Sequence, residues 1–357
     1  MPTLYKVSQN PLIFHSYNFG NICSPVKQLA SYIRYEKNIH FVLTLNWSIR
    51  PKNKLEQFVK AYHFYAKKYP NLIVTVLANE PEELELLRAH HIRSELCNQN
   101  ALLDERCYTI HPVEKRYRAI SNSRMASYKR LELLRNVEDC ALITYFLDPS
   151  DHQYEDYILG HSGNPHPACP NLICPQFDGK RWAWYDTNQI CKMLSASQCG
   201  VILSAEEGAC FAAVEYLLCG LPVVTTPNIG GRDAMFDADY VIWADPNPDS
   251  VAKAVKKAIS LSISPQEIRK KTIEKMHKER KIYCDILNSI AREEGIEKDF
   301  HKEWDDFYIN KLLNNMSEKE SVIYLNNSGI NTYYSIPHRI HNAHKLLKLY
   351  IKKHLSK

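Results

Sequence analysis

Residues 201–226, VILSAEEGACFAAVEYLLCGLPVVTT, contain the pattern that decides the fold. The apolar run 201–204 predicts a strand, residues 209–219 predict a helix, and residues 221–226 predict a second strand. Gly208 marks the turn from the first strand into the helix. Two strands joined by a helix are typical of a parallel crossover, so this stretch indicates a parallel α/β sheet.

The same alternation of strands and helices extends in both directions along the chain. The further predicted strands are 40–46, 71–78, 119–123, 141–146, a short one near 171, and 239–244. The further predicted helices are 52–69, 82–91, 129–139, 187–198 and 250–259. The polar segment 148–170, which contains proline and glycine, is expected to be a surface loop.

Two separate runs of this alternation predict an α/β protein with two Rossmann-like, doubly wound domains. A chain of 357 residues also exceeds what one typical hydrophobic core supports. We expect one domain over residues 1–115, a second domain over 116–265, and a helical extension over 266–357 that crosses back toward the first domain.

Composition excludes several classes of protein. With 45% hydrophobic and 24% charged residues the chain is a folded globular protein. The net charge of +5 is too small to indicate a nucleic-acid partner, although it suits anionic ligands. Residues 1–14 lack the basic start and apolar core of a signal peptide, and no apolar run approaches the roughly 18 residues of a bilayer span. We therefore expect a cytoplasmic protein.

The cysteines and histidines do not indicate a metal site. The 11 cysteines are an odd number and lie largely in apolar segments, which favours reduced thiols in the core. His161, His166, Cys169 and Cys174 could ligate zinc, but their spacing matches no common zinc pattern and an ordinary loop is the favoured interpretation.

The residues that carry chemistry follow predicted strands of the second domain, where doubly wound sheets bind their ligands. After the strand at 201–204 come Glu207, Gly208 and Ala209, at the N-terminus of a helix that also contains Glu215. Glycine permits close backbone approach, and free N–H groups at a helix start attract anions. The plainer alternative is that the acids only complement the helix dipole.

Two other loops have the same placement. Gly230 and Gly231, followed by Arg232, can form a backbone nest for an oxyanion or sugar hydroxyls. Asn122, Arg124 and Lys129 follow the first strand of the second domain, and their cations suit a diphosphate.

Together these residues resemble the donor domain of retaining glycosyltransferases of the GT-B fold, grouped as glycosyltransferase family 4. The resemblance covers roughly residues 98–260. It rests on Glu207 and Glu215 in the Glu-x7-Glu spacing, the continuation from Glu215 to Val224, the paired glycines, Arg124 and Lys129 in the Arg-x4-Lys arrangement, and the stretch from Asn100 to Asp104. The turn of Asn18, Gly20 and Asn21 occupies the place of the family's glycine-rich first loop but lacks its second glycine.

The resemblance implies a role for each residue. Arg124 and Lys129 would stabilise the leaving diphosphate, and Glu207 would contact the sugar hydroxyls, so these three are the expected catalytic residues. Glu215 would hold the ribose hydroxyls. The other expected donor-binding residues are Asn122, Gly208, Ala209, Gly230, Gly231 and Arg232, and the acceptor-side candidates are Asn18, Gly20 and Asn21.

The expected function is transfer of a sugar from a nucleotide-diphosphate sugar to a glycan or lipid-linked acceptor, with retention of configuration and without a metal or other cofactor. The alternatives are a non-catalytic GT-B-like subunit that binds a nucleotide sugar, and a sugar epimerase of the same architecture. A metal-dependent transferase using Asp237-Ala-Asp239 is a further alternative, but this pair lies too late in the chain for that fold.

The end of the chain is basic with helical spacing. Ile340, Ala343, Leu347 and Tyr350 share one face of a helix over residues 338–357, and Arg339, Lys345, Lys348, Lys352 and Lys353 supply charge. This segment predicts either packing against the first domain or peripheral contact with an anionic membrane.

Overall fold

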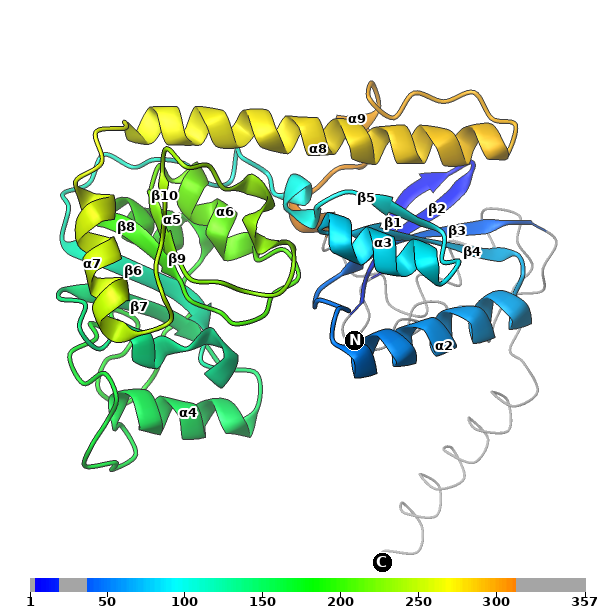
Figure 1. Cartoon of the computed structure of the whole chain (residues 1–357). Coiled ribbons are helices and arrows are strands. Elements are labelled where there is room, and N and C mark those ends of the chain that lie inside the picture. Colours follow the sequence, from blue (N-terminus) through cyan, green and yellow to red (C-terminus); the bar gives the residue numbers. More distant parts are fainter. Residues whose placement is uncertain (1–3, 19–36, 313–357) are drawn as a thin grey trace, which may run out of the picture.

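The computed structural model describes residues 4–18 and 37–312 and shows two α/β domains spanned by one long helix, α8 (Pro265–Glu293) (Figure 1). Each domain is built on a five-stranded sheet. The first sheet contains β1 (Leu4–Gln9), β2 (Leu12–Asn18), β3 (Ile39–Leu45), β4 (Leu72–Ala78) and β5 (Ser94–Leu96). The second contains β6 (Tyr117–Arg124), β7 (Cys140–Tyr145), β8 (Ser197–Ile202), β9 (Val223–Thr225) and β10 (Val241–Trp243). The prediction of two Rossmann-like sheets is confirmed.

The first sheet has the order β1-β2-β3-β4-β5, with β2 to β5 parallel and β1 antiparallel at the edge. Alternate residues of β3 point to opposite faces. Phe41 and Leu43 pack with α2 (Lys52–Lys68) and α3 (Pro81–Ala89), whereas Val42 packs with α8. The sheet is therefore covered on both faces, as parallel sheets require.

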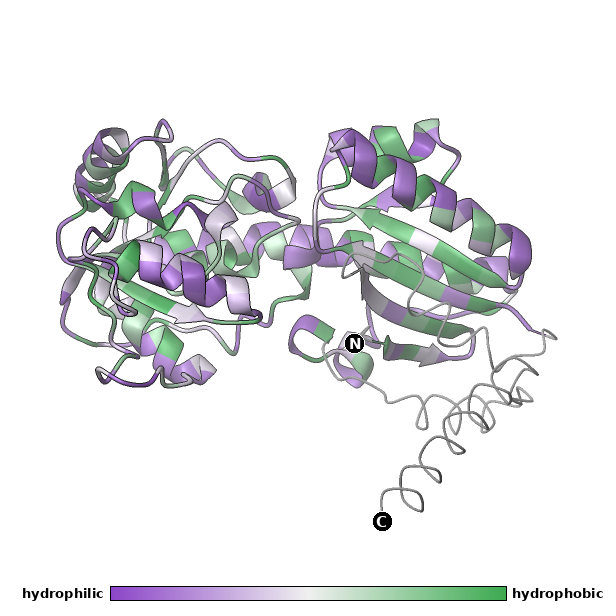
Figure 2. Ribbon diagram, turned by 90° about the horizontal axis from the view of Figure 1, so that it is seen from below, coloured by the Kyte–Doolittle hydropathy of each residue, from purple (hydrophilic) through white to green (hydrophobic). Residues whose placement is uncertain are grey.

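The second sheet is entirely parallel, in the order β10-β9-β8-β6-β7. Ile202 of β8 packs in one cluster with α5 (Thr187–Ser195) and α6 (Phe211–Leu218), and Val201 packs in the other with α4 (Pro149–Leu159) and α7 (Pro248–Ile259). Figure 2 shows the resulting distribution, with hydrophobic strands between helices that are hydrophilic on their outer faces.

Helix α8 joins the two domains along one side of the molecule (Figure 1). Ile268 and Met276 in its first half belong to the second domain's core, and Tyr283 and Leu287 in its second half belong to the first domain's core. The remaining short helices are η1 (Gln99–Leu102), η2 (Ser127–Lys129), η3 (Leu131–Leu134), η4 (Gly231–Met235), α9 (Trp304–Phe307) and η5 (Asn310–Leu312).

Arg280 fixes α8 to the connection between the domains. Its guanidinium donates to the carbonyls of Ala101 at 3.0 Å and Leu103 at 2.6 Å, and it pairs with Glu105. Burial alone would raise the pKa of Glu105, but hydrogen bonds from Arg280 and His277 hold that pKa at about 2. The domain boundaries at residues 115 and 265 lie between β5 and β6 and at the start of α8; as limits of independently folding units they stay a prediction.

The prediction of a loop over 148–170 was wrong for its first half, which forms α4. Asp148 and Asp151 make a reciprocal capping box, Pro149 occupies the first turn, and Gly160 ends the helix with a φ of 74°. The proline and glycine that suggested a loop are therefore the two boundaries of a helix.

Two smaller predictions for the second domain were also wrong. Residues 129–139 form no α-helix, because Arg130 adopts a left-handed φ of 52° that separates the 3-10 turns η2 and η3. No strand forms near residue 171 in the described chain, where Ile173 makes only an isolated bridge to Ala141. Three strands of the first sheet, β1, β2 and β5, were not predicted.

Among the described residues, no helix is both long enough and apolar enough to cross a membrane. The basic segment 338–357 lies outside the described residues.

Candidate functional site

The site lies where the carboxyl ends of β6, β8 and β9 meet the first domain. These three strands are neighbours in the second sheet, so the loops that follow them share one edge. Helix α6 begins directly after the β8 loop. The loops after β3 and β4 of the first domain approach the same edge.

Lys129 and Glu207 form an ion pair at the centre of this edge. Their side chains are only 12% and 10% exposed, so the pair is largely removed from water. Burial lowers the pKa of Lys129, but the negative charge of Glu207 more than offsets this and the pKa is raised. Lys129 Nζ also lies 5.0 Å from the ring centroid of Tyr128. The pair therefore presents one fixed cation and one carboxylate side by side.

Glu215 lies one helical turn into α6, and its carboxylate is buried. Asn122 at the end of β6 donates from Nδ2 to Glu215 Oε2 at 3.2 Å. Lys311, from the C-terminal extension, lies with Nζ 2.9 Å from Glu215 Oε1. The backbone N–H of Asn122 donates to the Tyr216 hydroxyl, which fixes β6 against α6. The predicted donor residues Asn122 and Glu215 are thus in contact.

Arg124 is not in contact with the Lys129–Glu207 pair. Its Nε lies 2.8 Å from Asp151 Oδ2, and its Nη2 pairs with Asp148. Hydrogen bonds to Asp151 raise the pKa of Arg124 still further, so it carries its charge at any physiological pH. It lines a polar hollow together with Ala126, Ser127, Tyr128, Ser150, Asp151, Gln153, Tyr154 and Tyr157. The spacing of Arg124 and Lys129 therefore places two cations in the same region. Each cation has its own acidic partner.

The glycines lie where the two domains touch. A Cβ added at Gly208 would meet the carbonyl oxygen of Leu45 at 2.5 Å, and one at Gly231 would meet that of Asn79 at 2.3 Å. Gly230 has a φ of 115° and its added Cβ would lie 1.7 Å from the carbonyl oxygen of Glu207. Only glycine fits this approach of backbones.

Asparagine side chains connect the domains at these glycine loops. Asn98 Nδ2 donates to the Gly231 carbonyl at 2.7 Å, and Asn100 Nδ2 donates to the Ala209 carbonyl at 2.6 Å. Several buried polar atoms at this junction lack a hydrogen-bond partner within the described chain: Asn46 Oδ1, Gln99 Oε1, Asn100 Oδ1, Ser204 Oγ and Asn228 Oδ1. Orphaned buried acceptors are uncommon, and here they indicate a place for a polar ligand or water.

Arg232 has a different role from the direct donor contact that the sequence suggested. Its side chain is fully buried and donates to the carbonyls of Ser204 at 3.2 Å and Thr226 at 2.7 Å, with Nε 2.8 Å from Asp233. The guanidinium is committed to these partners, so Arg232 holds the β8 and β9 loops in place.

Other sequence candidates are placed away from the site or cannot be placed. Asp237 and Asp239 pair with Lys275 and Lys271. His161 pairs with Glu155, and Cys169 Sγ lies 3.4 Å from the Leu131 carbonyl. No three His, Cys, Asp or Glu side chains within the described ranges could together hold a metal ion. Asn18 ends β2, whereas Gly20 and Asn21 lie outside the described residues.

Sequence reasoning missed contacts contributed by the first domain and by the extension. Lys54 of α2 pairs with Glu206, the Trp47 ring lies edge-on to Tyr128 with centroids 4.9 Å apart, and Lys311 reaches Glu215. No spacing along the chain could reveal them, because the partners are 81 to 152 residues apart; the Lys54–Glu206 pair is separated by 152 residues.

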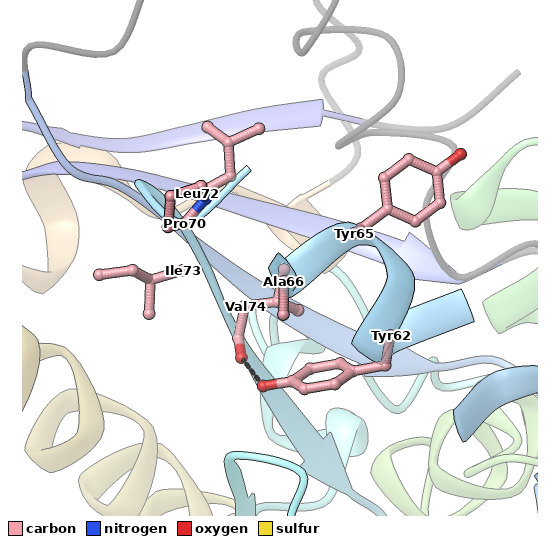
Figure 3. A pocket seen from close by; sticks show the side chains of 7 residues that line it. All are labelled: Tyr62, Tyr65, Ala66, Pro70, Leu72, Ile73 and Val74. Atoms are coloured by element: carbon pink, nitrogen blue, oxygen red, sulfur yellow. Dashed lines mark hydrogen bonds between the residues drawn. The ribbon is translucent and has the colours of Figure 1, made fainter. Parts of the chain in front are cut away.

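A second hollow, between α2 and β4, shares no residue with this site (Figure 3). It is lined by Tyr62, Tyr65, Ala66, Pro70, Leu72, Ile73 and Val74. The Tyr62 hydroxyl donates to the Val74 carbonyl at 3.0 Å, as Figure 3 shows. This apolar lining carries no candidate for acid–base or electrostatic chemistry.

Comparison with known proteins agrees with this geometry. Residues 178–276 match the family described as glycosyl transferases group 1. Over 67 residues the chain is 39% identical to one of the subunits of phosphatidylinositol N-acetylglucosaminyltransferase from Arabidopsis thaliana. That alignment covers 18% of this chain and 15% of the relative, so it spans only a small part of the relative's length.

Solved structures are similar over a larger share of the chain. The UDP-forming α,α-trehalose-phosphate synthase from Burkholderia vietnamiensis has a TM-score of 0.56 at 11% identity, covering 82% of this chain and 75% of its own. Sucrose-phosphate synthase from Thermosynechococcus elongatus has a TM-score of 0.52 at 14% identity, covering 82% and 74%. HepE from Anabaena, in complex with UDP, has a TM-score of 0.53 at 14% identity, covering 70% and 72%. The chain therefore has the GT-B fold, and a segment that runs from the second domain into α8 matches the group 1 glycosyl transferases.

Proposed function

We propose that this chain transfers a sugar from a nucleotide-diphosphate sugar to a glycan or lipid-linked acceptor, with retention of anomeric configuration. The observation that carries the proposal is the largely buried Lys129–Glu207 pair, which lies at the same edge of the second sheet as the Glu215–Asn122 contact and next to Gly208, where the second domain approaches the first. A cation next to carboxylates suits a ligand that combines a diphosphate with hydroxyl groups.

Lys129 and Glu207 exchange partners when the donor binds in this proposal. The diphosphate draws the Lys129 ammonium, and Glu207 accepts hydrogen bonds from the sugar. As the bond between sugar and phosphate breaks, negative charge grows on the leaving diphosphate and the sugar gains positive character. A cation and a carboxylate fixed in a site with little water stabilise both changes.

Arg124 adds a second cation only if it leaves Asp151 and Asp148, since its guanidinium is paired with both carboxylates. We assign it the outer part of the diphosphate, reached by a side-chain rotation. With Arg124 and Lys129 supplying positive charge, the transfer needs no metal ion and no other cofactor. Retained activity in excess EDTA is the expected result.

Glu215 holds the ribose, and the backbone at Gly231 approaches the diphosphate or sugar. Gly208 and Gly231 are in close contact with the first domain, and in this proposal the domains separate for the donor to enter and then close over it. We assign the acceptor to the first-domain side of the same junction.

A thermal-shift panel tests the proposal without knowledge of the acceptor. A ligand that binds only the native state stabilises it according to occupancy. We expect one nucleotide among UDP, GDP, ADP, TDP and CMP to raise the melting temperature of the full chain, and its sugar conjugate to raise it further. No shift with any nucleotide or nucleotide sugar at millimolar concentration would overturn the proposal.

We further propose peripheral membrane contact through the basic segment 338–357, which would bring the site to lipid-linked acceptors. Flotation of the full chain with anionic vesicles should exceed that of a chain ending at residue 337. Equal recovery of both chains rules this role out.

A further inference from the structure

The C-terminal extension returns to the junction between the domains after α9. Figure 1 shows this orange segment descending from α8 toward η1. The Tyr308 hydroxyl donates to the Leu102 carbonyl at 3.0 Å, and Asn310 Oδ1 accepts from the Asp104 N–H at 2.9 Å. The Tyr17 hydroxyl donates to the Lys311 carbonyl. The first domain and the interdomain connection therefore hold this segment.

The Lys311 side chain leaves that anchor and reaches the second domain. Its Nζ lies 2.9 Å from Glu215 Oε1 and 5.0 Å from the ring centroid of Phe211, the first residue of α6. It also lies 5.5 Å from the ring centroid of Tyr108. An ammonium from the end of the described chain is thus placed on the carboxylate assigned to the ribose.

The backbone at this point is fixed by its surroundings. Lys311 and Leu312 both have left-handed φ values, of 61° and 46°, and neither is glycine. Non-glycine residues keep this conformation where packing over-determines it, and Leu312 is fully buried. The Lys311 and Glu215 side chains are 19% and 8% exposed, which distinguishes their contact from a solvated surface pair.

We propose that Lys311 is a positioning residue of the donor site, which holds the Glu215 carboxylate in an orientation that accepts hydrogen bonds from the ribose hydroxyls. This inference rests on the proposed function. Each carboxylate oxygen can accept two hydrogen bonds. Lys311 takes one position on Oε1 and Asn122 takes one on Oε2, so each oxygen can still accept a hydroxyl.

Without Lys311 the buried Glu215 carboxylate loses its countercharge and one of the two groups that orient it, so it turns away toward water. A carboxylate that has turned away accepts fewer hydrogen bonds from the ribose. Lys311 thereby determines how strongly the site distinguishes ribose from deoxyribose.

Calorimetric titration of the full chain with UDP and with 2′-deoxy-UDP tests this role. If the thermal-shift panel selects another base, the matching GDP or ADP pair is used instead. We expect the wild type to bind the ribonucleotide roughly 10-fold more tightly or better, because one charge-assisted hydrogen bond is lost with the hydroxyl. Lys311→Met and Glu215→Gln should each bring the two affinities close together. The double variant should lose no more discrimination than either single variant, and Lys311→Arg should restore part of it.

The ratio of the two affinities separates a positioning role from a general structural role. A general structural role would weaken the binding of both nucleotides equally, and that result would overturn the inference. Lys298→Met is the matched control, because it removes another ammonium of the extension, 2.9 Å from Glu303, and should keep the wild-type ratio. If Lys311→Met does not fold, Lys311→Gln serves, since it keeps a donor for Glu215 without the charge. If a folded Lys311 variant keeps the wild-type affinity ratio, the inference is contradicted. The proposed function still stands in that case, because the chain binds UDP. Failure of the wild type to bind any nucleotide contradicts both.

Discussion

At the residue scale, Lys129 and Glu207 depend on each other for stability as well as for the proposed chemistry. Each is the countercharge of the other, and their side chains are only 12% and 10% exposed, so the pair is largely shielded from water. Removing one partner of a buried pair costs about 3–5 kcal/mol, because the other charge stays uncompensated. The free energy of unfolding must therefore be measured alongside the activity of each single variant.

We expect Lys129→Ala to lower turnover about 10²-fold or more, by analogy with the loss of one donor to a developing oxyanion. Glu207→Ala should nearly abolish transfer while nucleotide affinity stays close to the wild-type value, since the proposed partner of Glu207 is the sugar. Steady-state kinetics and nucleotide titration measure the two effects.

The double variant Lys129→Met with Glu207→Gln is the control for stability. It should recover most of the free energy of unfolding in urea without recovering transfer. Wild-type turnover in any of these variants at saturating donor would show that the pair has been assigned wrongly.

The sequence predicted the residues of this site better than their partners. Glu207, Asn122 and Lys129 were singled out after predicted strands and Glu215 in the helix that follows one of those strands, and the structure brings all four to one edge of the sheet. The acidic partners of Arg124 were missed, because they belong to the helix α4 that was predicted as a loop. Periodicity reports which face of an element is buried, and it carries no information on pairs formed between elements.

At the element scale, the first turn of α3 holds, by hydrogen bonds, both first-domain loops that touch the site. Glu83 is fully buried, and its carboxylate accepts from the Ile49 N–H at 3.2 Å and from the Asn79 N–H at 3.1 Å. Asn79 in turn contacts Gly231. The position of the α3 N-terminus thus sets the position of the loops after β3 and β4.

Glu83 should make stability depend on pH. Burial raises its pKa from 4.5 to about 7 in the folded chain, so the folded state binds the proton more tightly than the unfolded state does. The stabilisation from the protonated form is complete below about pH 4.5 and is lost as the pH rises through 7. At about 1.4 kcal/mol for each pKa unit, the loss is on the order of 3 kcal/mol.

The free energy of unfolding in urea, measured from pH 5 to pH 8, checks this expectation. The difference between wild type and Glu83→Gln should change by about that amount over the range, to the disadvantage of the wild type at high pH. Glu82→Gln, which removes an exposed carboxylate from the same turn, is the matched control for the loss of a charge at this helix start. A difference for Glu83→Gln that is constant with pH would mean that Glu83 does not titrate in this range.

Elements with strong hydrophobic alternation were predicted well. A helix defined mainly by its capping residues and the strands at the edges of the first sheet were missed. The parallel strands β3, β4 and β6 to β10, and the helices α2, α3, α5, α6 and α7, were predicted within a few residues. The strands β1 and β2 were missed because an antiparallel hairpin contributes no helix to the strand–helix alternation, and β5 was missed because it has only three residues. The helix α4 was missed because its capping residues were taken as loop residues.

At the scale of the whole molecule, the two domains close on each other through glycine. Gly208 and Gly231 of the second domain approach the backbone of Leu45 and Asn79 in the first. Asn98 and Asn100 then bridge the junction by hydrogen bonds. The sequence could predict two domains, but the side chains that join them lie far from their partners in the chain and follow no repeat.

Gly208→Ala should hold the domains apart, because its Cβ would lie 2.5 Å from the Leu45 carbonyl oxygen. A misplacement on the order of 1 Å can lower a rate about 10²-fold. We therefore expect a larger radius of gyration in small-angle scattering and a turnover reduced by about that factor, with cooperative unfolding preserved.

Gly295→Ala is the control for this variant. It also adds a methyl group at a glycine, with a φ of 69°, but no atom lies within 4 Å of the new Cβ. It should cost some stability without changing the scattering profile or the turnover. Wild-type scattering and turnover in Gly208→Ala would contradict the closed arrangement as the active one.

The most direct test of the central claim is release of nucleoside diphosphate by the purified chain from a panel of nucleotide sugars, with EDTA present. We predict that one donor is consumed, by transfer to an added glycan or lipid-linked acceptor or by slow hydrolysis, and that Glu207→Ala stops the reaction while still binding the free nucleotide. Consumption of no donor by a folded wild-type chain, or equal rates for wild type and Glu207→Ala, would contradict the proposal that this junction is the active site of a glycosyltransferase.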